Sequence, residues 1–115
     1  MAKNQNENDE IYTFTLNDVE YECKFNLKRI ELIENTTNLP TLAMINNTNG
    51  LLSISSLKTY MGYTLKRVGE DNFIPFRMAQ EIAEDAINTC GYVEIDNIVM
   101  NSLLRDCPFF FPENL

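Results

Sequence analysis

The chain contains no histidine and no tryptophan, and it holds only four glycines among its 115 residues. Histidine is the side chain that enzymes use most often as a general base, and it is also the commonest metal ligand. The glycines are isolated at positions 50, 62, 69 and 91, so none of them opens a phosphate-binding loop. These absences predict that the protein is not an enzyme and that it holds no cofactor and no metal.

Cysteine is scarce as well, with Cys23, Cys90 and Cys107 far apart in the sequence. An odd number of cysteines, without a Cys-x-x-Cys pair and without histidine, speaks against a disulfide framework and against a zinc site. We expect three reduced thiols that pack as small apolar side chains.

Long hydrophobic runs are missing too. No segment approaches the roughly 20 apolar residues that a membrane span requires. In the first ten residues only Met1 and Ala2 are apolar, which excludes a signal peptide and predicts a disordered tail over 1–10. We expect residues 11–115 to form a single domain of a protein that is soluble and cytoplasmic.

Positive charge is in deficit, because Lys and Arg total 9 against 17 Asp and Glu, which gives a net charge of −8. An acidic chain repels phosphate backbones, so nucleic acid is not an expected partner. Lys58, Lys66 and Arg67 form a local basic excess, which we interpret as a solvated face that balances nearby acids rather than as an anion site. Neighbouring carboxylates such as Glu84 and Asp85 diverge on a helix and are also expected to be solvated surface.

A β-hairpin is the clearest local pattern that is present. Residues 11–16 and 19–25 alternate apolar with polar side chains, and Asn17-Asp18 between them suits a two-residue turn. In this register the apolar cross-strand pairs share one face, and a slip by one residue would turn all of them outward. The predicted pairs are Leu16 with Val19, Phe14 with Tyr21 and Tyr12 with Cys23.

The segment after the hairpin carries helical signals of uneven strength. Asn26 is a suitable cap for a short helix whose apolar side chains repeat every three or four residues and which ends near Asn35. Residues 36–50 contain Pro40, Gly50 and several asparagines, a composition that shortens helices. We expect an irregular connection here that includes no more than one helical turn.

Three further helices are predicted from the spacing of apolar residues. The first of them follows a cap at Ser53 or Ser55 and ends at Gly69. The next two are expected at 76–90 and at about 94–105.

Gly62 lies inside the predicted helix that ends at Gly69, where it lowers the helix propensity relative to alanine. Its presence there indicates a close crossing with another helix. Together the elements predict an α+β fold, mainly helical, in which an N-terminal β-hairpin packs on three or four α-helices.

The C-terminal sequence CPFFFPENL has the weakest structural explanation. Phe109, Phe110 and Phe111 stand between two prolines, and three consecutive phenylalanines cannot all face one core. One interpretation is that one or two rings dock on the domain while the rest stay half exposed. The other is that the cluster is an apolar anchor for a partner or for self-association, with Tyr60 and Tyr63 as further candidates.

The order of the elements resembles a known family. The hairpin has the form F-x-L-x-x-x-x-Y-x-x-x-F-N, carried by Phe14, Leu16, Tyr21, Phe25 and Asn26, and it runs into helices that end in an aromatic-rich tail. Over most of its length this pattern is similar to the tail assembly chaperones of long-tailed phages and prophages of Gram-positive bacteria.

The resemblance implies a non-enzymatic role in viral morphogenesis. Such chaperones bind the helical tape-measure protein in the host bacterial cytoplasm, keep it soluble and help to recruit tail-tube protein. The resemblance also implies a homo-oligomer. A longer form made by ribosomal frameshifting is a further expectation, because the consecutive Phe codons at Phe109–Phe111 can form a slippery all-uridine run.

A second class of function stays open, namely a small acidic adaptor or regulatory protein of the anti-repressor type that binds a host or phage protein. Such a protein would need its carboxylates on one face, whereas here they are scattered among Lys and Arg. A small enzyme has only the carboxylate pairs in its favour. The chaperone is therefore the preferred hypothesis.

Overall fold

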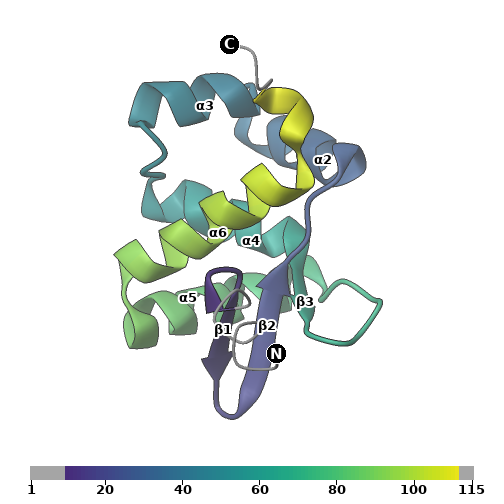
Figure 1. Ribbon diagram of the computed structural model, residues 1–115, viewed down its shortest axis with the longest axis vertical. Helices are drawn as coiled ribbons and strands as arrows, with labels where there is room; N and C mark the ends of the chain where they lie inside the picture. Colours follow the sequence, from purple (N-terminus) through teal and green to yellow (C-terminus); the bar gives the residue numbers. More distant parts are fainter. Residues whose placement is uncertain (1–9, 112–115) are drawn as a thin grey trace, which may run out of the picture.

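A three-stranded antiparallel sheet forms the lower part of the molecule (Figure 1). The structure is a computed structural model, and it describes residues 10–111 of the chain. Strands β1 (Thr13–Leu16), β2 (Val19–Cys23) and β3 (Leu65–Arg67) lie side by side in that order. Because β3 comes from far along the chain, the sheet ties the N-terminal hairpin to the helical part. The predicted disordered tail falls, apart from Glu10, outside the described residues.

The predicted hairpin and its register are confirmed. Asn17 and Asp18 have φ angles of 53° and 66°, the two left-handed conformations that a type I′ turn requires. The turn therefore matches the twist of the strands, and the buried side chains fall on one face. The pairs Leu16–Val19 and Phe14–Tyr21 are formed as predicted. The paired part of the hairpin ends at Thr13–Glu22, so the third predicted pair, Tyr12–Cys23, is not formed.

Five α-helices lie in the described part of the chain, which confirms the mainly helical α+β fold. Their apolar stripes share one core with the inner face of the sheet. The helices are α2 (Leu27–Thr37), α3 (Thr41–Thr48), α4 (Ile54–Thr64), α5 (Phe76–Cys90) and α6 (Tyr92–Asp106), and a 3₁₀ helix η1 (Pro108–Phe110) follows them.

The helix predicted to end at Gly69 stops earlier, so that prediction is wrong for its last turn. Helix α4 ends at Thr64, and Leu65 takes an extended conformation with φ −76° and ψ 136°. Leu65 then pairs with Cys23 of β2, and both side chains are fully buried. A strand buries this apolar side chain as well as a helix would, and it also satisfies the second edge of β2. Apolar spacing alone could not separate the two outcomes.

The prediction of an irregular connection over 36–50 is wrong as well. Helix α2 continues to Thr37, and α3 forms a helix of 8 residues. Each of these helices ends on an asparagine in the left-handed conformation, Asn38 with φ 60° and Asn49 with φ 55°. The asparagines that indicated a broken chain thus act as helix C-caps, because Asn adopts this conformation more readily than most residues.

The predicted N-caps and the close crossing at Gly62 are confirmed. The Asn26 side chain accepts the Arg29 N–H at 2.9 Å, and it is Ser53 that caps α4. A Cβ atom at Gly62 would come within 2.6 Å of a ring carbon of Phe76, so the absence of a side chain there lets α4 and α5 approach each other.

Helix α6 runs across the front of the molecule, between α3 and the sheet (Figure 1). It packs on β1 and β2 as well as on α4 and α5, and η1 continues from its end. The end of the described chain therefore comes to lie on the same side of the molecule as α3. None of the described helices combines the length and the apolar character that crossing a membrane would need.

Candidate functional site

The three phenylalanines of the C-terminal cluster lie on and directly after η1, and they differ in exposure. Phe109 is 52% exposed, whereas Phe110 and Phe111 are partly buried against the core. The ring centroids of Phe109 and Phe110 lie 5.0 Å apart, and those of Phe110 and Phe111 lie 6.0 Å apart. Two rings therefore dock on the domain, and one is presented to solvent.

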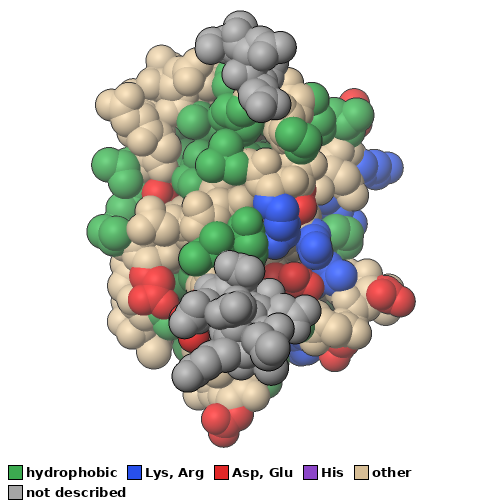
Figure 2. Space-filling view, in the orientation of Figure 1, with side chains coloured by type: hydrophobic (Ala, Val, Ile, Leu, Met, Phe, Trp, Pro, Cys, Tyr) green, Lys and Arg blue, Asp and Glu red, His purple; other side chains and the backbone are tan. Residues whose placement is uncertain are grey.

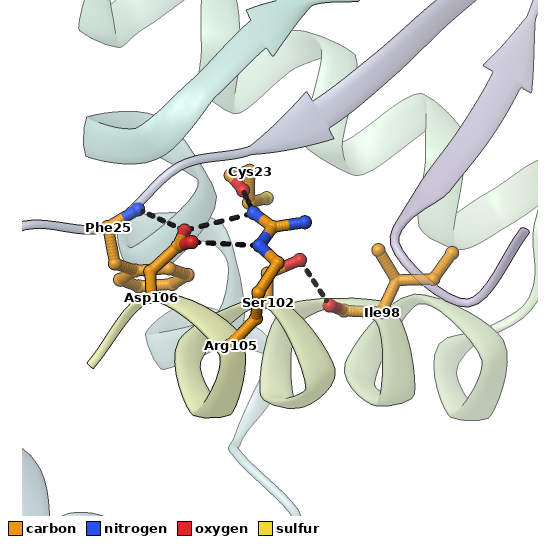
Figure 3. A network of polar contacts seen from close by, with 6 residues as sticks. All are labelled: Cys23, Phe25, Ile98, Ser102, Arg105 and Asp106. Carbon is orange, nitrogen blue, oxygen red and sulfur yellow. Dashed lines mark hydrogen bonds and ion pairs between the residues drawn. The ribbon is translucent and has the colours of Figure 1, made fainter. Parts of the chain in front are cut away.

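A network of polar contacts fixes the end of α6 and thereby the position of η1 (Figure 3). The Asp106 carboxylate accepts the Phe25 backbone N–H at 2.9 Å and forms a two-point ion pair with Arg105, with N–O distances of 2.8 and 2.9 Å. The same guanidinium donates to the Cys23 carbonyl at 2.9 Å. We name these contacts among Arg105, Asp106, Cys23 and Phe25 the α6 clasp.

The α6 clasp is electrostatically well matched. Burial alone would raise the pKa of Asp106, but the hydrogen bonds from Arg105 and from the Phe25 N–H outweigh it and hold that pKa below its usual range. Arg105 also lies over the Tyr12 ring, 4.5 Å from its centroid. The clasp thus binds the end of β2 to the end of α6, and it acts as a scaffold for the phenylalanine cluster.

A hollow of about 400 Å³ lies between α3 and α6, and Phe111 forms part of its wall. We refer to it as the α3–α6 groove. Its lining is apolar or amide-bearing, apart from one carboxylate. The lining residues are Ile45, Asn46, Asn49, Gly50, Leu51, Asp96, Asn97, Met100, Leu104 and Phe111.

The groove borders a long stretch without charge. Residues 35–57 contain no Lys, Arg, Asp or Glu, although these types make up 23% of the chain. Figure 2 shows the same feature on the surface, because the upper part, around α3, is mainly apolar or uncharged, whereas most of the Lys and Arg side chains in view gather lower on the right. We term α3, the α3–α6 groove and η1 together the uncharged face.

Large apolar side chains are exposed on the uncharged face. Leu42 on α3, Leu51 after it and Leu104 on α6 are 37%, 56% and 47% exposed. Scattered exposed leucines are ordinary, but here Leu51 and Leu104 line the groove together with Phe111. Such a grouping is typical of a surface that contacts another protein.

The two tyrosines nominated from the sequence lie elsewhere. Tyr60 is 1% exposed, and burial raises its pKa to about 12. Tyr63 is half-buried between α2 and α5, where its hydroxyl lies 2.7 Å from the Thr36 hydroxyl and its ring packs on Phe76. Within the described residues no ring contact joins either tyrosine to the phenylalanine cluster.

Asp96 is the buried carboxylate of the groove, with 1% of its surface exposed. It accepts the Leu52 backbone N–H at 3.2 Å, and the Tyr92 hydroxyl donates to the carbonyl of the same Leu52. Burial raises the pKa of Asp96, and the bond from Leu52 opposes this only in part. One turn of α6 therefore holds both polar backbone groups of Leu52 in the connection between α3 and α4.

No group of three Cys, Asp or Glu side chains between residues 10 and 111 is placed to hold a metal ion. Cys23 and Cys107 are buried, and burial raises the pKa of their thiols to about 12 and about 11, so both stay protonated at neutral pH. Glu84 is exposed and pairs with Lys58 at 2.9 Å, in agreement with the predicted solvated surface.

Sequence reasoning nominated the phenylalanines and missed the groove beside them. Its α3 wall was expected to be irregular chain, so its lining could not be assembled from apolar spacing. A signal for the surface was nevertheless present, because a run without charge over 35–57 is unusual in a chain with 23% charged residues.

The arrangement can bind an apolar protein segment, since it combines exposed apolar rings with a groove whose polar groups are mostly amides. Comparison of the chain with protein-family models, with curated proteins and with solved structures found no match.

Proposed function

We propose that this protein is a phage tail assembly chaperone that binds the tape-measure protein, keeps it soluble and helps to recruit tail-tube subunits in the cytoplasm of a host bacterium. The proposal rests on the resemblance given above and on the uncharged face. A homo-oligomer belongs to the same proposal.

The residues that carry the resemblance have structural roles. Phe14, Leu16, Tyr21 and Phe25 are buried, and Asn26 caps α2. Their pattern therefore supports a likeness of fold. Because these residues are buried or cap a helix, the proposed binding function has to be supported by other residues, which are exposed.

The observation that carries the function is the exposed ring of Phe109 on η1, a part of the uncharged face. A client made of long apolar helices aggregates unless its apolar stripes are covered. The uncharged face can cover such a stripe without taking charged groups out of water, which would oppose binding. The chain carries a net charge of −8, and repulsion between like-charged complexes keeps them in solution.

The test is co-expression with the tape-measure protein encoded nearby, followed by sizing of the soluble fraction. We expect a soluble complex, and we expect Phe109→Asp to weaken it by about tenfold or more, because a few aromatic anchors carry much of the binding energy of an interface. Val93→Asp is the matched control, since Val93 is 62% exposed at the opposite end of α6.

Equal solubility of the tape-measure protein with and without this chain, together with the absence of a complex, would contradict the proposal. The same outcome would favour the acidic adaptor, whose binding would not depend on Phe109.

A further inference from the structure

Asp96 is a buried carboxylate without a cationic partner. The residue is 1% exposed, and no Lys or Arg between residues 10 and 111 forms an ion pair with it. Buried aspartates in proteins are almost always paired, because a charge that leaves water without a partner opposes folding. Asp106 on the same helix shows the usual solution, since Arg105 binds both of its oxygens. The described part of the chain therefore leaves the charge of Asp96 uncompensated.

The two carboxylate oxygens of Asp96 have different surroundings. Oδ1 accepts the Leu52 backbone N–H at 3.2 Å, whereas no hydrogen bond from a described residue reaches Oδ2. In the same part of the chain, the one side-chain oxygen that is fully enclosed without a partner is Oγ1 of Thr41, so Oδ2 of Asp96 is not sealed off. Because Asp96 lines the α3–α6 groove, Oδ2 can accept a donor that enters it.

The lining of the groove indicates that this donor is an organic cation. A chain of methylene groups would bury apolar surface there, as the stem of a lysine side chain does when its charged end reaches a polar group. A hard ion such as Ca²⁺ would need roughly six to eight oxygen ligands, whereas the lining contains one carboxylate. The apolar lining residues are Ile45, Leu51, Met100, Leu104 and Phe111.

The single available oxygen favours an ammonium group over a guanidinium. A guanidinium binds a carboxylate best through two parallel bonds, as Arg105 does with Asp106, and it then needs both oxygens. Leu52 already occupies Oδ1 of Asp96, so a one-point contact remains. An ammonium group is a compact charge that binds through single hydrogen bonds. The geometry therefore suits lysine better than arginine.

The surroundings of the groove indicate that the lysine belongs to a protein. Leu51 and Leu104 line the groove and are 56% and 47% exposed, and Phe111 in its wall belongs to the same cluster as the exposed Phe109. A small amine in the groove would leave these apolar side chains in water. A helix that carries one lysine within an apolar stripe covers them and reaches Asp96 as well.

We propose that Asp96 is a recognition site for the ammonium group of a lysine, carried in the apolar stripe of a client helix that lies over the α3–α6 groove. The identity of the client rests on the proposed function, whereas the ammonium site does not. The charge of Asp96 has already left water when the chain folds, so binding dehydrates the ammonium group alone. Such a site gives a reason for a buried charge that opposes folding, because binding sites retain groups that stability alone would remove.

NMR titration of the purified full chain tests the ammonium site. The probes are n-butylammonium chloride, which reproduces the side chain of lysine, and 1-butanol, which has the same length and no charge. We expect n-butylammonium to shift the Leu52 amide signal at concentrations about tenfold lower than 1-butanol, because hydrogen bonds between charged groups are the stronger ones. Sodium chloride at equal concentration controls for ionic strength and for an inorganic cation.

Asp96→Asn removes the charge and keeps an oxygen for the Leu52 N–H, so it should abolish the advantage of n-butylammonium over 1-butanol. The same variant should weaken the complex with the tape-measure protein by about tenfold, the effect of losing one charged hydrogen bond. Glu94→Gln is the matched control, since Glu94 is an exposed carboxylate on the same helix and its loss changes the net charge equally. We expect this control to leave both kinds of binding unchanged.

The ammonium site and the proposed function fail in different ways. Equal binding of the two probes, no binding of either, an equal shift with sodium chloride, or an unchanged preference in Asp96→Asn would overturn the ammonium site. A preference that Asp96→Asn abolishes, beside a tape-measure complex that the same variant leaves unchanged, would overturn the client lysine and leave the chaperone function intact. An ammonium site in a protein that binds no tape-measure protein would support the site and overturn the proposed function.

Discussion

Asp96 and Asp106 lie on the same helix, and each accepts a backbone N–H from a distant segment, yet their surroundings differ. Asp106 binds the Phe25 N–H at 2.9 Å and is neutralised by the two-point ion pair with Arg105. Asp96 binds the Leu52 N–H at 3.2 Å, and no cation among the described residues pairs with it. The pKa is accordingly lowered at Asp106 and raised at Asp96.

The difference shows how one helix can join a firm part to a yielding part. At its end, the α6 clasp joins α6 to the end of β2 with two bonds, one to the Cys23 carbonyl and one from the Phe25 N–H, and the Arg105 and Asp106 side chains that make them form an ion pair. Near its start, Asp96 holds the connection after α3 while its own charge is poorly solvated. We therefore expect substitutions at the clasp to lower global stability and the Asp96→Asn substitution to have a smaller effect of opposite sign.

The largest effect is expected from Asp106→Ala. This change leaves the Phe25 N–H and most of the Arg105 guanidinium without an acceptor, and it should lower the free energy of unfolding by about 2–3 kcal/mol. Urea unfolding followed by circular dichroism measures it. Glu70→Gln removes an exposed partner of Arg67 at 3.8 Å and should change the stability by less than about 0.5 kcal/mol. A loss as small as that of the control would mean that the clasp is not a stabilising element.

The next largest change in stability is expected within the phenylalanine cluster. Phe110→Asp places a charge against the core and should cost about 2 kcal/mol, whereas Phe109→Asp should leave stability nearly unchanged because Phe109 is 52% exposed. Removal of residues 108–115 should weaken self-association or partner binding while helix content is retained. Thermal unfolding and light scattering separate the two effects, and loss of the whole fold in any of these variants would show that the cluster is part of the core.

Much of the fold could be predicted because local rules and burial agreed. At Asn17-Asp18 the turn length, the alternation of side chains and the left-handed preference of both residues all favour one register. At Gly62 a poor helix former inside a strong apolar stripe indicated the crossing that the structure contains. The sequence was enough to predict the structure at positions where a residue fits only one local conformation or one kind of packing.

The remaining parts could not be predicted because their residues serve two structures equally well. Leu65 satisfies a helical stripe and a buried strand, and the partner that decides is Cys23, 42 positions away. Asn38 and Asn49 suit a loop and a helix C-cap alike. The groove depends on α3, so the wrong prediction over 36–50 also concealed the contacts that Asp96 and Tyr92 make with Leu52.

The smallest effect is expected from Asp96→Asn, and its sign distinguishes the two aspartates. The amide oxygen can still accept the Leu52 N–H, and the cost of burying a negative charge disappears. Because Asp96 lines the groove, the new amide hydrogens can face it. We expect a gain of about 0.5–1 kcal/mol in the free energy of unfolding at pH 7, whereas Asp106→Asn should lower it.

The pH dependence of the stability changes caused by Asp96→Asn and Asp106→Asn tests the contrast between the two aspartates most directly. A raised pKa in the folded state means that the ionised Asp96 opposes folding above its pKa. The gain from Asp96→Asn is therefore present at pH 7 and fades as the pH falls through the folded pKa, and it is lost below about pH 4, where the unfolded state binds the proton as well. The lowered pKa of Asp106 means that its ionised form stabilises the fold above about pH 4, and this contribution is lost as the pH falls further. Urea unfolding of both variants and the unaltered protein between pH 3 and 7 should therefore give differences of opposite sign that both shrink in acid. A loss of stability in Asp96→Asn at every pH would show that the charge of Asp96 holds the α3 connection in place, and the contrast between a firm and a yielding end of α6 would not stand.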